Sequence, residues 1–227
     1  MDIKTKLDLL EKIYNIFDSF ISDIDSACTE KCNDCCSQDV IITTLEAYQI
    51  SNFLIENKKE HFFDIIEEQI NTPHYQPQIT INELAKLCKN NEEIKDDIRQ
   101  SSKEKCPLLD NEKCVVYPIR PLSCRSLIST IKCNENGFAT IEPFVITVSN
   151  MFQQIIENLD KKGCTGNLID VVHIMKSAEN RLKYENDDLY MQPLLKNHFS
   201  DSLLVPSEHI EKIKPIYRSL GNIFNPL

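Results

Sequence analysis

The spacing of apolar residues along this chain of 227 residues predicts a protein built mainly from helices. From Lys4 to about Asp25, apolar residues recur three or four positions apart, which is the period of an amphipathic helix. The same period predicts further helices over residues 44–56, 61–70, 80–101, 145–159, 167–184, 189–199 and 207–220.

Two of these helices begin with a capping signal. Thr43 stands three residues before Glu46, and Thr80 stands three residues before Glu83. In such a capping box, each side chain satisfies a free backbone amide of the first turn. The stretch 106–133 instead contains three prolines, and each restricts the backbone of the residue before it. We therefore expect irregular structure there.

These patterns predict a mainly α fold class, an irregular helical domain with cysteine-rich loops and few or no strands. The stretch 140–146 fits either a short strand or an apolar crossover. We expect a single domain over residues 1–227. Within it we expect a cysteine-bearing core at 28–130 and C-terminal helices at 145–220.

Composition and charge exclude several classes of protein. The chain has 25 Lys and Arg against 35 Asp and Glu, a net charge of −10, and no basic run. We expect no nucleic-acid partner, because affinity for nucleic acid comes mostly from neutralised phosphates. No segment approaches the roughly 18 apolar residues of a membrane span, and the first apolar stretch carries charges, unlike a secretory signal. The expected location is cytoplasmic, with no membrane partner.

The most unusual feature of the composition is its ten cysteines. Seven of them fall in two short windows, namely Cys28, Cys32, Cys35 and Cys36 in the first and Cys106, Cys114 and Cys124 in the second. Thiols stay reduced in the cytoplasm, where clustered cysteines are typical of metal sites or catalysis. Cys88 and Cys164 stand alone and are expected to pack as small apolar residues. For Cys133 both interpretations stay open.

The first window is not expected to complete a metal site alone. Adjacent Cys35 and Cys36 should project in different directions, which leaves three ligands where a tetrahedral site needs four. Joining the second window closes a loop of about 70 residues, at an entropic cost of ~4 kcal/mol plus a constant. A structural thiolate metal site contributes roughly 10–16 kcal/mol in apparent terms. A metal joining the windows is therefore affordable, and its removal should loosen the fold.

Three motifs carry a resemblance to a known family. They read CNDCC at 32–36, TTLEA at 43–47 and CPLLDNEKCVVYPIRPLSCR at 106–125. Together they resemble the YkgJ-type CxxCxxCC cysteine-cluster family, described as zinc- or iron-chelating proteins. The resemblance covers roughly residues 28–130. This chain departs from the pattern in the three-residue gap between Cys28 and Cys32, and in Asn33 where a glycine is usual.

The resemblance implies a metal held by cysteines, either zinc or an iron–sulfur cluster. Seven clustered thiols and five scattered histidines favour iron–sulfur, most simply a [4Fe–4S] cluster, because one zinc needs fewer ligands. A structural zinc-binding module is the first alternative. The second is an S-adenosylmethionine-dependent protein lysine methyltransferase, as attributed to the flagellin methylase branch of the family. Whether the protein is an enzyme stays open.

Arg125 directly follows Cys124 and is the candidate cofactor-binding residue outside the cysteines. We expect its guanidinium to donate to a thiolate or to the surrounding loop, since such donors tune thiolate-bound metals. The candidate metal ligands are the seven cysteines of the two windows, and the sequence does not select four among them. Besides the metal, the expected partner is another protein.

Overall fold

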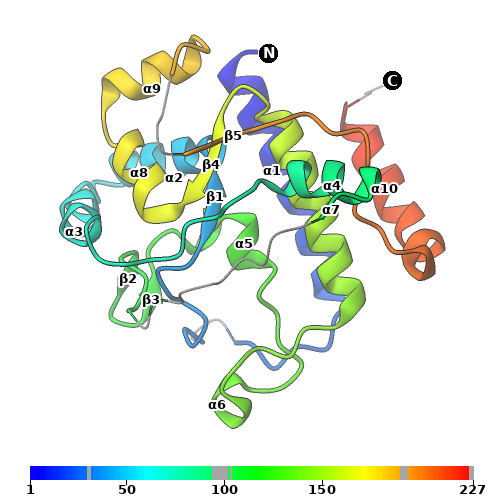
Figure 1. Cartoon of the computed structure of the whole chain (residues 1–227). Coiled ribbons are helices and arrows are strands. Elements are labelled where there is room, and N and C mark those ends of the chain that lie inside the picture. Colours follow the sequence, from blue (N-terminus) through cyan, green and yellow to red (C-terminus); the bar gives the residue numbers. More distant parts are fainter. Residues whose placement is uncertain (30–31, 94–101, 103, 190–193, 225–227) are drawn as a thin grey trace.

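Helices make up most of the chain in the computed structural model, which describes residues 1–29, 32–93, 102, 104–189 and 194–224 (Figure 1). The helices are α1 (Ile3–Ser22), α2 (Thr44–Glu56), α3 (His61–Gln69), α4 (Ile81–Asn90), α5 (Leu122–Arg125), α6 (Cys133–Asn136), α7 (Pro143–Leu159), α8 (Leu168–Met175), α9 (Ala178–Glu185) and α10 (Ile210–Phe224), with short 3-10 turns at Tyr117–Ile119 and Ser207–His209. The strands are β1 (Ile41–Thr43), β2 (Leu109–Asp110), β3 (Lys113–Cys114), β4 (Cys164–Asn167) and β5 (Leu195–Lys196). The predicted mainly α fold class is confirmed.

The apolar faces of α1 and α7 meet in the core. The side chains of Leu10, Ile13 and Phe17 on α1 are fully buried, at the helical spacing that the sequence predicts. Phe17 packs edge-on against Phe152 of α7, with ring centroids 5.1 Å apart. Helix α10 lies along α1, and the cluster of buried apolar side chains extends from Leu9 to Leu220. The division of the chain into domains stays a prediction.

A small antiparallel sheet lies between this helical group and the group of α2, α3, α8 and α9 (Figure 1). Its central strand is β4, with β1 on one side and β5 on the other. Ile41 pairs with Asn167 and Cys164 pairs with Lys196. The sheet therefore joins segments that lie about 120 residues apart in sequence, and it orients the start of α2.

The structure confirms the predicted helices at 4–25, 44–56, 61–70, 145–159 and 207–220, with ends shifted by a few residues. The capping box of α2 is complete, since the Thr43 hydroxyl accepts from the Glu46 amide and the Glu46 carboxylate accepts from the Thr43 amide. The local signal was sufficient there because both halves of the cap lie within four residues.

Three predicted helices need correction. The helix predicted over 80–101 ends at Asn90, because Asn91 takes a left-handed backbone (φ 52°) that closes the last turn; residues 94–101 lie outside the described part. The helix predicted over 167–184 begins only after β4 and is divided into α8 and α9. In the described part of 189–199 the chain forms β5 rather than a helix, because the edge of β4 offers it backbone partners.

The buried carboxylate of Glu46 connects three elements at the first turn of α2. Its Oε1 accepts from the Tyr14 hydroxyl of α1 and from the Leu122 amide that opens α5, both at 2.9 Å. Its Oε2 accepts from the Thr43 amide at 2.9 Å. A buried anion is stabilised by such donors and by the positive end of the helix dipole.

A second buried carboxylate, Asp160, meets the same turn from the end of α7. Its Oδ2 accepts from the Thr44 hydroxyl at 2.5 Å and from the Leu45 amide at 3.0 Å. Its Oδ1 accepts from the Tyr184 hydroxyl of α9 at 2.5 Å. Burial raises the pKa of Asp160 to about 6 in spite of these donors. As pH rises from about 4 to 6, this carboxyl therefore contributes progressively less to stability.

Gly163 lets the chain pass close to these groups. A Cβ at this position would lie 2.0 Å from Thr44 Oγ1 and 2.3 Å from an Asp160 oxygen. Such distances are far below ordinary contacts, so a larger residue would displace the hydrogen-bonded pair.

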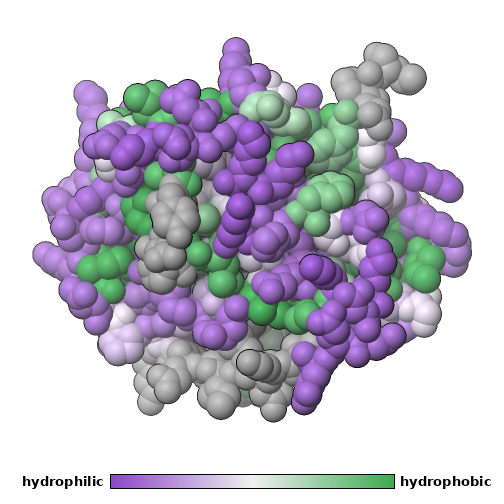
Figure 2. Space-filling model, turned by 45° about the horizontal axis from the view of Figure 1, so that its top comes forward, coloured by the Kyte–Doolittle hydropathy of each residue, from purple (hydrophilic) through white to green (hydrophobic). Residues whose placement is uncertain are grey.

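The surface is consistent with the acidic, polar composition. Hydrophilic side chains cover most of the face in Figure 2, and hydrophobic patches lie separately between them. None of the helices in the described part of the chain has the length and apolarity needed to cross a membrane.

We predict that Glu46→Gln lowers the free energy of unfolding by about 1–3 kcal/mol, because the amide group cannot accept where a carboxylate oxygen did. Urea unfolding followed by circular dichroism measures the change. The matched control is Glu179→Gln on the exposed face of α9, which loses only an exposed ion pair with Lys183 and should lower stability far less than Glu46→Gln does. Equal stability of Glu46→Gln and the control would contradict the role given to Glu46.

We predict that Asp160→Ala costs about 3 kcal/mol or more, because a hydroxyl, a phenol and a backbone amide lose their acceptor in the core. Asp160→Asn should lose less, since it keeps one oxygen acceptor. The same urea titrations measure both variants. If alanine is tolerated as well as asparagine, the hydrogen bonds of Asp160 do not stabilise the fold.

Candidate metal centre

The two cysteine windows lie side by side at the end of the molecule where α1 ends, near β2, β3 and α6 (Figure 1). Ser37 and Lys105 form an antiparallel bridge between the windows. The Cys106 amide donates to the Cys36 carbonyl at 3.1 Å. Backbone hydrogen bonds therefore join two segments separated by about 70 residues, and they place the thiol-bearing loops together.

A hairpin turn and a short helix present the cysteines of the second window. Cys114 is on β3, opposite Leu109 of β2, and the turn between these strands has Asn111 and Glu112 at positive φ. Two such residues are typical of tight hairpin turns. Cys124 is on α5, whose first amide is held by Glu46.

The thiols of the second window influence one another and Cys35. Burial raises the pKa of Cys106 to about 12 and also raises the pKa of Cys114. The pKa of Cys124 is raised well above its ordinary value by burial and then by the charges of Cys106, Cys114 and Cys35. Cys124 therefore lies within electrostatic reach of the other three sulfurs.

Cys35 and Cys36 were expected to project apart, and the structure differs. The pKa of Cys35 lies well above the range of a free thiol, and the largest cause is a hydrogen bond with the Cys36 thiol. The backbone turns tightly here, with the Cys36 amide donating to the Asn33 carbonyl at 3.0 Å. Neighbouring thiols on such a turn can face the same region.

Cys133, for which the sequence left both interpretations open, lies near cysteines of the first window. The sulfur of Cys28 accepts from the Ser129 amide at 3.3 Å. The charges of Cys28, Cys35 and Cys32 raise the pKa of Cys133, after burial as the first cause. Cys133 also lines a cleft of about 220 Å³ together with Cys35 and the loop that ends α6. Cys133 therefore belongs with the clustered cysteines. The sequence signal for this was its position in the Pro-rich stretch 106–133, which also contains the second window.

The two isolated cysteines differ from each other. Cys164 is buried in β4, as expected, and burial raises its pKa to about 11. Cys88 is exposed on α4, so the prediction that it packs as an apolar residue is wrong. The buried residues of α4 are Asn82 and Ala85, and Cys88 lies one turn further along. All ten cysteines are free thiols.

Arg125, the candidate cofactor-binding residue, is buried beside the second window. Its Nε donates to the Arg120 carbonyl at 2.7 Å and its Nη2 donates to the Pro118 carbonyl at 3.1 Å. Its Nη1 forms an ion pair with Asp18 of α1, and the guanidinium lies over the Tyr14 ring. These contacts hold the turn before α5 in place. A contact between Arg125 and a cofactor stays a prediction.

Arg120, unlike Arg125, has a side-chain donor that is not used in a hydrogen bond with a described residue. Its Nε is buried and has no hydrogen-bond acceptor among the residues that the structure describes. Its charge lowers the pKa of Cys114, so the guanidinium acts on that thiol electrostatically. A buried donor without an acceptor in the second window is suited to a thiolate or to a cluster sulfide.

The donor set fits a thiophilic metal. The clustered groups are thiols, and their mutual repulsion as thiolates is relieved only by a cation among them. As the side chains stand, no three Cys, His, Asp or Glu residues in the described ranges converge as ligands of one ion. The thiols are thus gathered at one end of the molecule without closing on a single point.

Comparison with known proteins agrees with this chemistry. No significant match to a curated protein or to a solved structure is found. A family profile described as "CxxCxxCC: Putative zinc- or iron-chelating domain" matches residues 27–144, which is 118 of the 227 residues and includes both cysteine windows and Cys133. The chain therefore belongs to the CxxCxxCC family of zinc- or iron-chelating domains.

Proposed function

We propose that this protein holds an iron–sulfur cluster, most simply [4Fe–4S], through cysteines of both windows. The candidate ligands are Cys28, Cys32, Cys35, Cys36, Cys106, Cys114 and Cys124. The observation that supports this best is the backbone pairing of Cys36 with Cys106, which brings the windows together. Cys133 joins the candidates because it lines a cleft with Cys35.

The choice of iron–sulfur over zinc rests on the number and kind of ligands. One structural zinc takes four ligands, often including histidine. This end of the molecule offers eight thiols, which exceed the needs of one zinc ion. Cluster sulfides also accept hydrogen bonds, and the buried Nε of Arg120 is a donor of the right kind.

The protein's own residues would hold and tune the cluster. Glu46 fixes the first amide of α5 and thereby the position of Cys124. Arg125 fixes the turn that leads into the same helix. When bound, the cluster would supply an electron-transfer centre. The reducing cytoplasm, where free thiols persist, is the location that fits this proposal.

We predict that protein purified without oxygen is coloured and contains about four irons per chain. Metal analysis and a visible absorption spectrum measure this. Cys106→Ser and Cys124→Ser should lose most of the iron and colour, because both sulfurs belong to the interacting group. Cys88→Ser is the matched control and should keep both, since Cys88 is exposed on α4.

The other outcomes separate the alternatives. A colourless protein with one or two zincs and no iron would overturn the iron–sulfur proposal and favour a structural zinc module. A folded protein that contains no metal and takes up none would overturn metal binding altogether.

We predict that the metal-free protein binds a thiophilic probe ion more tightly as pH rises. Raised pKa values keep Cys106, Cys114 and Cys124 protonated at neutral pH, so each thiolate ligand must first lose a proton. Each proton released contributes about a tenfold change in affinity per pH unit. Titration with Co²⁺ at pH 6.5 and 7.5 should give at least about a hundredfold difference, corresponding to two or more protons.

The same titrations on Cys88→Ser and Cys106→Ser are the controls. The first should reproduce the pH dependence, and the second should reduce it. An affinity for Co²⁺ that does not change with pH would show that the buried thiols are not the ligands.

A further inference from the structure

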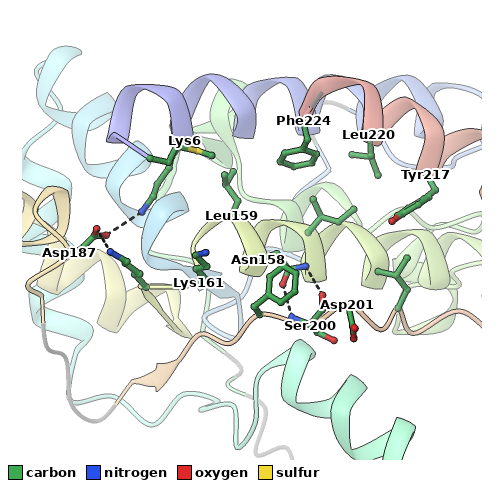
Figure 3. Close-up of a pocket in the computed structure, with 16 residues that line it drawn as sticks. Lys6, Asn158, Leu159, Lys161, Asp187, Ser200, Asp201, Tyr217, Leu220 and Phe224 are labelled. Carbon is green, nitrogen blue, oxygen red and sulfur yellow. Dashed lines mark hydrogen bonds and ion pairs between the residues drawn. The ribbon is translucent and has the colours of Figure 1, made fainter. Parts of the chain in front are cut away.

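A groove of about 740 Å³ lies at the other end of α1, away from the cysteines. Helices α1 and α10 form one wall, and α7 with the segment 199–203 forms the other (Figure 3). Its volume lies within the range of about 300–1,000 Å³ that is common for small-molecule sites. Lys6 and Cys28 flank opposite ends of α1, which separates them by roughly 25 Å along the helix.

One end of this groove is basic. Lys6 of α1 and Lys161 and Lys162 after α7 line this end together with the carboxylate of Asp187, and the other carboxylate of the groove wall is Asp201 (Figure 3). The Nζ atom of Lys162 lies 2.7 Å from Oδ2 of Asp187, whereas the Nζ atom of Lys6 lies 3.9 Å from Oδ1 of the same carboxylate. Lys161 has no ion-pair partner among the described residues.

Lys6 is the unusual member of this group. The residue is only 7% exposed, yet its ammonium donates no hydrogen bond to any residue that the structure describes. It lies 5.2 Å from the centre of the Tyr184 ring, and its charge also reaches Asp160 behind the groove. Asp160 already accepts from its own donors. Asp187 is the closer partner of Lys162, so at 3.9 Å it balances the charge of Lys6 without accepting a hydrogen bond from it. A second anion at this ammonium would supply that hydrogen bond.

The remainder of the groove is mainly apolar, and its polar residues are Asn158, Ser200 and Asp201. Leu159 of α7 faces Leu220 and Phe224 of α10 across it (Figure 3). Phe199, which is 67% exposed, lines the opposite edge, and Tyr217 closes the far end. Large apolar side chains left this open to water are typical of a surface that covers a ligand.

We propose that this groove binds a single-chain alkyl carboxylate, with its head group at Lys6 and Lys161 and its chain between α7 and α10. Charge complementarity favours this occupant over a neutral or cationic one. The chain as a whole carries −10, so a local excess of lysines is needed to attract an anion. The apolar wall then contributes affinity by burying the alkyl chain. The inference does not depend on the metal centre.

Isothermal titration calorimetry of the full chain with dodecanoate tests this proposal. Saturable binding of one dodecanoate per chain is expected. Dodecyltrimethylammonium, which has the same chain and a cationic head group, should bind at least about tenfold more weakly. Lys6→Met keeps the length and the apolar stem of the side chain, and it should weaken dodecanoate binding about tenfold or more.

Lys4→Met is the matched control, because Lys4 is exposed on the same helix and does not line the groove. It should bind dodecanoate like the unaltered protein. Phe199→Ser, at an exposed position, should weaken both amphiphiles by removing apolar contact. Thermal unfolding of each variant verifies that it is folded.

Three results would overturn the proposal. The first is the absence of saturable dodecanoate binding. The second is equal affinity for the two head groups, which would indicate unspecific apolar contact. The third is a folded Lys6→Met variant that binds as tightly as Lys4→Met.

Discussion

The pair of buried carboxylates at the first turn of α2 is the constraint on which most of the structure depends. Glu46 and Asp160 belong to different elements, yet both accept hydrogen bonds from the start of this helix. Through them, α2 is tied to α1, α5, α7 and α9. Each anion is buried, so its cost is offset only while every donor stays in place. This makes the arrangement specific, since a shifted helix would leave a charge without partners.

Of the two cysteine windows, only the second is held directly by these buried hydrogen bonds in the described part of the chain. Glu46 and Arg125 attach α5, and hence Cys124, to the packed helices. The first window leaves the end of α1 and reaches the second window through a few backbone hydrogen bonds around Cys36 and Lys105. Among residues 26–29 and 32–39, which the structure describes, none contributes a large apolar side chain to the core, and the first core residue after them is Val40. A metal bound by both windows would therefore strengthen the part of the molecule that the core stabilises least.

The sequence predicted those features whose cause is local. The capping box of Thr43 and Glu46 and the apolar period of α1 and α7 needed no distant partner, so these helices were foreseeable. Strand β4 was not, because residues 164–167 pair with segments 120 residues before them and 30 after them. The exposure of Cys88 and the proximity of Cys133 to Cys35 likewise depend on how elements meet. That the two windows lie together was predicted from the number of ligands that a metal needs. That the Nε of Arg120 is buried without an acceptor among the described residues could be seen only in the structure.

Thiols that bind a metal carry negative charge as thiolates, which is unfavourable in a protein of net charge −10. Cations close to the thiols offset this repulsion. The charges of Arg120 and Lys59 lower the pKa of Cys114, against the effect of burial. Lys59 also donates to the Val115 carbonyl at 3.2 Å, and Lys105 donates to the Asn33 carbonyl at 3.0 Å, so both cations are anchored in the cysteine loops. The same principle operates at the other end of α1, where Lys6 is buried in an otherwise acidic molecule. At both ends, the position of a few cations would decide which anion the protein accepts, because their field acts over a few ångströms and the net charge is screened by salt beyond about 10 Å.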